Sequence, residues 1–383
     1  MVYLPKRSFL NYFVFNTILS NVPSILVIVL IPYLFADSFN PLFISGIVFT
    51  AYRLGNITGT YLGPSIAKYA TPNKLAVVFE IFNFITAFAF AICIYKSIYS
   101  APLFAFLYYQ KGAIAGMHAN TRFQWLKAIS LQAPSASKIS VYTGGIVQAA
   151  FGVGGALLFF TKHVSQDFFL LIFSLDLITS IISAVIFYTL TAGELPSIEK
   201  KETFNLFKIL KEPKIRNFAV ADFFIALAVA GTNILILRFG NEMFVGKDGY
   251  PLSLIIYSTS FLIGSYIVNE TRLKNIKLHN QVLFFSISSL GIAFLSGGMK
   301  IISFFIFFLI YPLLLLGLEK SWFENLDAKI AGKAYSQRVI FLSFIWALGE
   351  VVYANINNDF EVRSIFLFIG TVLLFLLRNK NKS

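Results

Sequence analysis

Long apolar runs separated by short polar stretches repeat along the whole chain. Each run holds about 20 mostly apolar residues, the length at which an α-helix crosses a hydrocarbon layer of about 30 Å. This pattern predicts an all-α membrane protein with twelve transmembrane helices. The predicted spans are 9–35, 42–67, 75–96, 101–121, 138–161, 167–190, 217–238, 250–270, 279–298, 301–320, 336–356 and 362–378.

The longest polar stretch lies in the middle of the chain and separates six predicted spans from the other six. We therefore predict an N-terminal six-helix bundle in residues 1–190, a cytoplasmic linker in residues 191–216 and a C-terminal six-helix bundle in residues 217–383. Inside the linker, the segment "TFNLFKILKEP" has apolar residues at helical spacing beside lysines. This spacing fits either a short helix on the cytoplasmic membrane surface or a solvated charged loop.

The two predicted bundles share features about half a chain length apart, as expected after an internal duplication. Such duplications produce pseudo-symmetric halves with a binding site at their interface, near the middle of the bilayer. The pattern therefore favours two pseudo-symmetric six-helix bundles. The matching pairs are Lys68 with Lys274, Gly116 with Gly317 and Gly152 with Gly349.

The composition excludes an ordinary soluble domain, because 57% of the 383 residues are hydrophobic and only 13% are charged. The net charge of +13 could indicate a nucleic-acid partner, but the distribution of the basic residues excludes one. Twenty-two of the 31 lysines and arginines fall on the side of the N-terminus, and six on the other. This positive-inside asymmetry predicts that both termini are cytoplasmic. Residue usage rich in Phe, Ile, Asn and Lys favours a bacterial gene, and hence the bacterial inner membrane.

Metal and cofactor chemistry has little support in the sequence. Cys93 is the only cysteine, and His118, His163 and His279 have no ligand spacing. No Gly-x-x-x-x-Gly-Lys motif for ATP is present. We therefore expect no metal, no cofactor and no enzymatic activity.

The loop "GPSIAKYATPNK", residues 63–74, resembles the loop between spans two and three of major facilitator superfamily transporters. That family has roughly Gly-x-x-x-Asp-Arg/Lys-x-Gly-Arg/Lys-Arg/Lys. Gly63, Lys68 and Lys74 match the leading glycine and two basic positions, whereas Ala67 and Ala70 replace the aspartate and the second glycine. The resemblance implies a gating role for the three matching residues, although the gating acid is missing.

Two further segments resemble the same family. "QKGAIAG" is similar to its fourth-span Arg-x-x-x-Gly region, with Lys111 in place of the arginine. "GGIVQAAFGVGG" resembles the glycine-rich antiporter motif of drug-exporting members, with Val153 where a proline is usual. The resemblance implies gating roles for Gly152, Gly154 and Gly155. It also implies a monomeric transporter, and favours export.

Two cations lie near the middle of predicted spans, where a charge costs about 2.5–3.5 kcal/mol on insertion scales. Arg53 shares a helical face with polar side chains including Asn56, as expected for the wall of a wet cavity. Lys111 shares its face with His118. We predict that Arg53 and Lys111 bind an anionic group or hold a carboxylate, with Asn56 beside them.

Carboxylates in the second half are candidates for proton coupling. Asp222 and Asn233 share a face of the seventh span, and Glu350 shares a face with Trp346 in the eleventh. We predict that Glu350 or Asp222 takes up the coupling proton when the hydration of the cavity changes. Alternatively, a buried pair such as Arg53 with Glu350 would only set helix packing.

Aromatic side chains beside these polar faces are candidate substrate contacts. They are Trp346, Tyr142 and Tyr257, although core packing is the favoured role for each one taken singly. Glu80 and Asp176 lie on the third and sixth spans, which are peripheral in this architecture, so we expect structural or gating roles for them.

The function expected from these features is proton-coupled export of small amphipathic molecules, such as a drug, a siderophore or a peptide antibiotic. An organic-anion uptake symporter is the alternative within transport. A membrane-embedded transferase would rest on "HVSQD", residues 163–167, which faintly resembles a His-x-x-x-Asp catalytic pair. A receptor that keeps the transporter fold is the third class. The expected partners are a small-molecule substrate, protons and the lipid bilayer.

Overall fold

The computed structural model describes residues 7–35, 40–66, 69–130, 136–161, 165–189, 213–230, 232–244, 249–270, 278–324, 328–356 and 359–380. Side chains in parts of these helices, including those of residues 120–130, 136–147 and 328–337, fall outside the description. The helices are α1 (Arg7–Leu34), α2 (Pro41–Ile66), α3 (Pro72–Tyr95), α4 (Ala101–Ser130), α5 (Ala136–Thr161), α6 (Gln166–Thr189), α8 (Pro213–Val229), α9 (Thr232–Met243), α10 (Gly249–Glu270), α11 (Leu278–Phe294), α12 (Gly297–Glu324), α13 (Ala328–Asn355) and α14 (Asp359–Lys380).

Eleven of the twelve predicted spans each coincide with one helix, because each is a long apolar run with polar ends. The prediction of one continuous helix over residues 217–238 was wrong. Here α8 ends at Val229, α9 begins at Thr232, and the two segments are bent by 53°. Gly231 lies at this break in the sequence, and glycine costs about 1 kcal/mol relative to alanine inside a helix.

Within the described residues, five helices are long and apolar enough to cross a membrane by themselves. The bent pair of α8 and α9 raises this number to six if it forms one span. Other helices, such as α2 and α4, carry glycines and charged residues, which lower their hydropathy. Hydropathy of single helices therefore understates how many of these segments belong to a membrane bundle.

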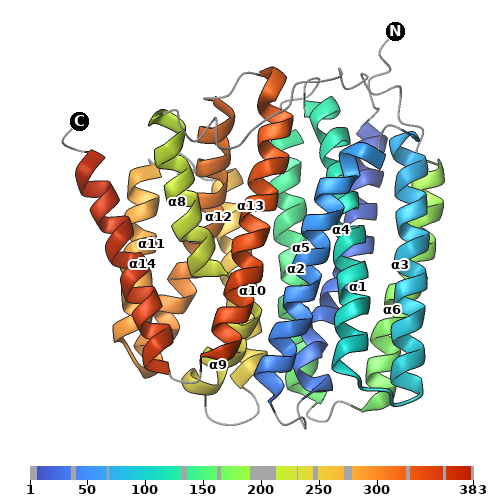
Figure 1. Cartoon of the computed structure of the whole chain (residues 1–383), viewed down its shortest axis with the longest axis horizontal. Helices are drawn as coiled ribbons and strands as arrows, with labels where there is room; N and C mark the ends of the chain where they lie inside the picture. The colour runs from blue at the N-terminus through green and yellow to red at the C-terminus, as the bar shows by residue number, and fades with distance from the viewer. Residues whose placement is uncertain are drawn as a thin grey trace. The chain divides into compact units, whose positions relative to one another are not determined.

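The chain divides into two compact units. The N-terminal unit comprises Met1–Ala150 and Thr161–Glu202, and the C-terminal unit comprises Phe151–Phe160 and Thr203–Ser383. In Figure 1 the colours run from blue to green over α1 to α6 and from yellow-green to red over α8 to α14. Most of the predicted linker, namely its residues 191–212, lies outside the described residues.

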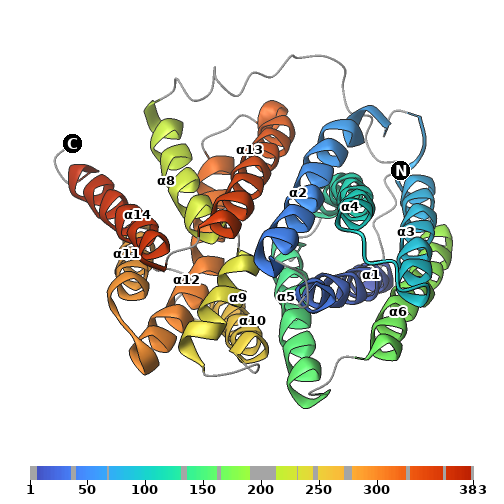
Figure 2. The same ribbon diagram turned by 60° about the horizontal axis from the view of Figure 1, so that its bottom comes forward.

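In the N-terminal unit, α2 packs most extensively on α4, and Figure 2 shows these two helices beside each other. The contact runs through Gly55 and Gly59 on α2, and through Gly112 and Gly116 on α4. A Cβ atom added to Gly59 would overlap the backbone of Ala113, and one added to Gly112 would overlap the backbone of α2. Small residues at four-residue spacing allow this close approach of membrane helices. Only glycine fits at these positions.

The other main contacts of the N-terminal unit join α3 to α6, α1 to α6, and α3 to α4. Aromatic rings fill part of the space between them. The ring of Phe90 lies 4.8 Å from that of Tyr108 and 5.3 Å from that of Phe173, measured between centroids. This packing turns one face of each of α1, α3, α4 and α6 toward the interior of the unit.

The C-terminal unit is built from contacts of α11 with α14 and α12, of α10 with α12 and α9, and of α13 with α8. Its core contains stacked rings, with Phe285 and Phe307 at 4.4 Å between centroids. Lys300 is buried at the start of α12, with its Nζ 4.5 Å above the ring centroid of Phe239. An aromatic face stabilises such a cation.

Candidate functional site

Four helices of the N-terminal unit bring hydrogen-bonding polar side chains together in its largely apolar interior. The positions on each helix are spaced by three, four or seven residues, so they lie on one face of that helix. All except Ser24 are at least nine-tenths buried. They are Asn16, Ser20 and Ser24 on α1, Glu80 and Asn83 on α3, Lys111 and His118 on α4, and Asp176, Ser180 and Ser183 on α6. They form two clusters.

The first is the lysine–aspartate cluster, built from Ser24, Asn83, Lys111, Asp176 and Ser180. The Nζ of Lys111 forms a salt bridge with Oδ2 of Asp176 and donates to Oδ1 of Asn83 at 3.2 Å. The hydroxyl of Ser24 donates to Oδ1 of Asp176 at 3.0 Å, and Nδ2 of Asn83 donates to Oγ of Ser180 at 2.8 Å. Lys111 thus holds a carboxylate, one of the two alternatives that the sequence left open.

The second is the glutamate–histidine cluster, built from Asn16, Ser20, Glu80, His118 and Ser183. Oε1 of Glu80 accepts hydrogen bonds from the hydroxyls of Ser20 and Ser183, both at 2.8 Å. The Nε2 of His118 lies 3.3 Å from the same oxygen. Nδ2 of Asn16 donates to the carbonyl of Ser183 at 3.3 Å. One carboxylate oxygen therefore joins α1, α3, α4 and α6.

Rings of two further residues enclose the imidazole of His118. The centroids of Phe79 and Phe187 lie 5.4 Å and 5.9 Å from that of His118. Phe187 is fully buried, and His118 itself is 5% exposed. The acid and the imidazole therefore meet in surroundings that are largely apolar, where their electrostatic interaction is stronger than in water.

The C-terminal unit has a buried ion pair of its own between α8 and α13. The guanidinium of Arg338 donates from Nη2 to Oδ1 of Asp222 at 2.9 Å and from Nε to Oδ2 at 2.5 Å. Both residues are less than 5% exposed. Arg338 lies within the predicted span 336–356, and the structure buries it in α13. Two parallel hydrogen bonds of this kind are the strongest form of an arginine–carboxylate pair.

Glu350 and Trp346 both lie on α13, one helical turn apart, as expected from the sequence. Glu350 is fully buried and Trp346 is half-buried. A third residue of this helix, Tyr353, donates its hydroxyl to the carbonyl of Leu227 on α8 at 3.4 Å. Asp222 on α8 and Glu350 on α13, the two predicted proton-coupling residues, therefore lie on helices that contact each other.

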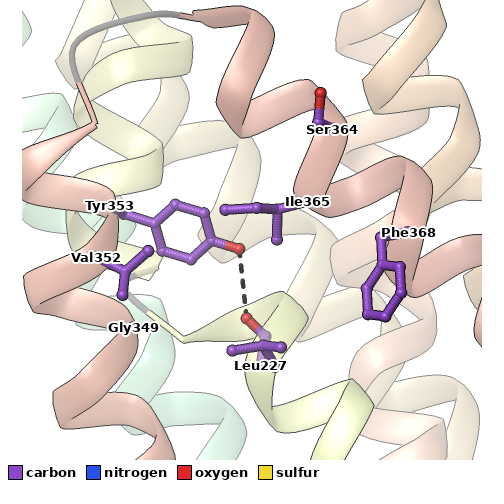
Figure 3. A pocket seen from close by; sticks show the side chains of 7 residues that line it. All are labelled: Leu227, Gly349, Val352, Tyr353, Ser364, Ile365 and Phe368. Carbon is purple, nitrogen blue, oxygen red and sulfur yellow. Dashed lines mark hydrogen bonds between the residues drawn. The ribbon is translucent and has the colours of Figure 1, made fainter.

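A hollow of about 340 Å³ lies among α8, α13 and α14. Figure 3 shows the hydroxyl of Tyr353 pointing to the carbonyl of Leu227 at its edge. The hydroxyl of Ser364 is also satisfied, because it donates to the carbonyl of Phe360 at 2.8 Å. The hollow suits a hydrocarbon chain better than a charged solute. Its lining residues are Leu227, Gly349, Val352, Tyr353, Ser364, Ile365 and Phe368.

The candidate substrate contacts on α2 are half-buried. The guanidinium carbon of Arg53 lies 5.9 Å from the ring centroid of its neighbour Tyr52, and Asn56 lies one turn further along the helix. The sequence-based pairing of Arg53 with Glu350 joins residues of different units and stays a prediction.

Tyr257 on α10 is buried among rings, with Phe308 at 4.7 Å and Phe151 at 5.5 Å between centroids, both edge-to-face. These contacts fit the core-packing role that the sequence left open for it. The side chains of Tyr142 and Asn233 lie outside the described residues, although their helices, α5 and α9, are described.

The glycines assigned to gating on α5 lie in the segment that groups with the C-terminal unit. A Cβ on Gly152 would overlap the side chain of Ser258, and one on Gly155 would lie 2.7 Å from the carbonyl oxygen of Pro251, both on α10. Gly154 between them is buried. These glycines therefore permit α5 to approach α10 closely, and their gating role stays a prediction.

The loop that resembles the family motif is only partly described. Gly63 is buried near the end of α2, and Lys74 is exposed in the first turn of α3. Lys68 lies outside the described residues, as do residues 162–164 of the segment "HVSQD". Among the residues that were searched, no group of three or more His, Cys, Asp or Glu could hold a metal ion.

Two features of the site were missed in the sequence. Asp176 and Glu80 were assigned structural or gating roles on peripheral spans, and their partners were not foreseen: Asp176 pairs with Lys111 and accepts from Ser24, and Glu80 accepts from Ser20 and Ser183. The signal was available, since an acid inside an apolar run requires a partner within the membrane. The paired Gly-x-x-x-Gly spacings "GNITG" and "GAIAG" on α2 and α4 likewise indicate helix contact.

Neither a protein-family model nor a curated protein matches the sequence. Solved transporter structures do match over nearly the whole chain. Nucleoside transporter NupG matches with a TM-score of 0.68 and 12% identity, over 97% of this chain and 98% of that one. A variant of the E. coli fucose:proton symporter FucP matches with a TM-score of 0.66 and 15% identity, over 99% of both chains. A D-xylose-proton symporter matches with a TM-score of 0.68 and 13% identity, over 96% of this chain and 95% of that one.

These likenesses define a class of fold. A further match is FucP in the outward conformation, a major facilitator superfamily transporter. It matches with a TM-score of 0.67 and 14% identity, over 97% of this chain and 99% of that one. The chain thus has the fold of these transporters. The predicted all-α membrane protein, with twelve spans in two bundles, is confirmed. It is a multi-pass membrane protein.

Proposed function

We propose that the chain is a proton-coupled secondary transporter that moves a small molecule by alternating access. The observation that carries this proposal is the burial of carboxylates inside a transporter fold. Glu350 on α13 is fully buried, and Glu80 on α3 is 1% exposed. Carboxylates at such depth are costly, and their protonation responds to hydration and to nearby charge. A group of this kind can couple proton binding to a change of conformation.

Export of small amphipathic molecules, such as a drug, a siderophore or a peptide antibiotic, is the direction that we propose first. It is supported by the glycine-rich segment "GGIVQAAFGVGG", which resembles the antiporter motif. Substrate contacts would come from Arg53, Asn56, Trp346 and Tyr257. Lys111, Tyr142 and Asn233 would complete the set, with Lys111 acting through Asp176.

Uptake by symport is the second candidate. It is supported by the titles of the similar structures, which include a fucose:proton and a D-xylose-proton symporter. The half-buried guanidinium of Arg53 would suit an organic anion. For either direction, the surplus of basic residues on the N-terminal side supports a bacterial inner-membrane protein with both termini in the cytoplasm. We propose that it works as a monomer.

The test is compound-driven proton movement in proteoliposomes with an imposed pH gradient, read by a pH-sensitive dye inside the vesicles. The compounds screened are ethidium, tetraphenylphosphonium, benzoate, fucose, D-xylose and uridine. Wild type is compared with Glu350→Gln. Glu361→Gln is the matched control, because it makes the same change at an exposed position of α14.

The proposal expects proton movement that depends on a compound in wild type and in Glu361→Gln and that is lost in Glu350→Gln. Protons moving against the compound indicate export, and protons moving with it indicate uptake. Flux that survives Glu350→Gln would move the proton site elsewhere in the chain. Absence of flux with every compound from folded protein would contradict proton coupling.

A further inference from the structure

Glu80 and His118 form an acid–imidazole pair in the interior of the N-terminal unit, whereas both residues predicted to carry the coupling proton, Asp222 and Glu350, belong to the C-terminal unit. Their Oε1 and Nε2 atoms lie 3.3 Å apart, and both side chains are less than a tenth exposed. Imidazole is the side chain that exchanges its proton near neutral pH. Two groups in such contact titrate as a unit, so the pair holds zero, one or two protons in steps.

The lysine–aspartate cluster supplies a comparison within the same four helices. Lys111 and Asp176 are equally buried and equally well hydrogen-bonded, but they contain no imidazole. We therefore interpret the Lys111–Asp176 contact as a fixed ion pair. Seven residues separate Lys111 from His118 along α4, and seven separate Asp176 from Ser183 along α6. The two clusters lie about two helical turns apart.

The charged and titratable groups around Glu80 are few among the described side chains. On α4 they are His118, Lys111 and Tyr108, and the hydroxyl of Tyr108 donates to the carbonyl of Val27. On α6 the only buried one is Asp176, because Asp167 and Tyr188 are exposed. The described part of α1 contributes only Tyr33. On α3 itself, Lys74 and Tyr95 are exposed. Arg122 on α4, four residues beyond His118, lies outside the described side chains.

We propose that the Glu80–His118 pair, in addition to Glu350, binds protons that drive transport, and that protonation of its carboxylate loosens the contact among α1, α3, α4 and α6. This inference rests on the proposed function of proton-coupled transport.

A proton from water binds a ring nitrogen of His118, and the imidazolium is held by the carboxylate of Glu80. A second proton neutralises the carboxylate and leaves the pair with one positive charge. No electrons move, and both protons return to water on release.

Protonation would act on packing through the shared acceptor. Oε1 of Glu80 accepts from Ser20 on α1 and from Ser183 on α6, and it lies against His118 on α4. Hydrogen bonds to a charged acceptor are roughly twice as strong as those between neutral groups. Loss of the negative charge therefore weakens three contacts between helices at once.

The first test asks whether the pair titrates, and it needs no substrate. The full-length protein is labelled with nitrogen isotope at histidine, reconstituted in lipid vesicles and studied by NMR across a pH series. The chain has only three histidines, and His118→Gln assigns the signal of His118 by its loss. We expect the His118 signal to change with pH and Glu80→Gln to alter that pH profile, whereas Glu361→Gln leaves it unchanged. If the pH profile of the His118 signal is the same in Glu80→Gln as in wild type, the proposed proton site is overturned.

The second test measures proton flux and compound exchange in three variants, which are Glu80→Gln, His118→Gln and the milder Glu80→Asp. For a compound that wild type moves from the set above, both proton flux and compound exchange without a pH gradient are measured. We expect Glu80→Gln and His118→Gln to lose proton flux while exchange persists. If both activities persist, the proton site is overturned and the proposed function stands. If both are lost in all three variants, the pair is structural and the inference fails.

If wild type shows exchange but no proton flux with any compound, the proposed function and this inference both fail, whatever the NMR profile. Size-exclusion profiles and melting temperatures of the variants confirm that each activity is measured on folded protein.

Discussion

Removing one partner of the Lys111–Asp176 pair is expected to destabilise the N-terminal unit strongly. In Asp176→Asn, the amine of Lys111, which is 2% exposed, would lose the carboxylate against which it lies and would keep the oxygen of Asn83 as its described acceptor. Breaking a buried pair in this way costs about 3–5 kcal/mol. Since each 1.4 kcal/mol changes an equilibrium constant tenfold, the ratio of folded to unfolded protein should fall by about two to three and a half orders of magnitude.

The matched control removes both charges. Lys111→Met combined with Asp176→Leu leaves no isolated charge, and such replacements are often neutral or stabilising by about 1–4 kcal/mol. The assay is equilibrium unfolding in mixed micelles of increasing SDS content, followed by the helical circular dichroism signal. If Asp176→Asn unfolds within about 0.5 kcal/mol of wild type, the range of ordinary surface substitutions, the ion pair does not hold these helices and the reasoning is refuted.

Two further predictions use the same unfolding assay. Gly59→Leu should destabilise the protein by about 1–3 kcal/mol or more, because the new side chain would overlap the backbone at Ala113. Gly298→Leu should have little effect, because a Cβ there meets nothing within 4 Å. Equal effects of the two substitutions would contradict the glycine contact. Asp222→Asn should destabilise by about 3–5 kcal/mol and be rescued by adding Arg338→Met. Unchanged stability with lost proton flux would instead favour the proton-carrying role predicted for Asp222.

The helices could be predicted from the sequence because hydropathy depends on local composition. α3 and α6 are predominantly apolar, and their predicted bounds agree with the structure to within a few residues. The break between α8 and α9 was missed, since Gly231 interrupts a run that is apolar on both sides. A single glycine weakens a helix by too little to fix its end without knowledge of its tertiary contacts.

The candidate site was predictable one helix at a time. The polar faces of α1 and α4 follow from residue spacing alone. The partner of Lys111 does not, because spacing along α4 contains no information on which face of α6 it meets. Lys111 and Asp176 are 65 residues apart, and only the packing of α1, α3, α4 and α6 brings them together.

The same separation constrains how the protein is made. Helices enter the membrane in the order of synthesis, and at about 5–20 residues per second the ribosome needs about 3–13 s to proceed from Lys111 to Asp176. During that interval α4 holds a cation whose carboxylate does not yet exist. In the C-terminal unit Asp222 waits for Arg338 over 116 residues, about 6–23 s. The buried ion pair of each unit therefore forms only after the later of its two helices has been synthesised. That helix is α6 in the N-terminal unit and α13 in the C-terminal unit. A chain that stops after α4 would leave Lys111 as a target for membrane quality control.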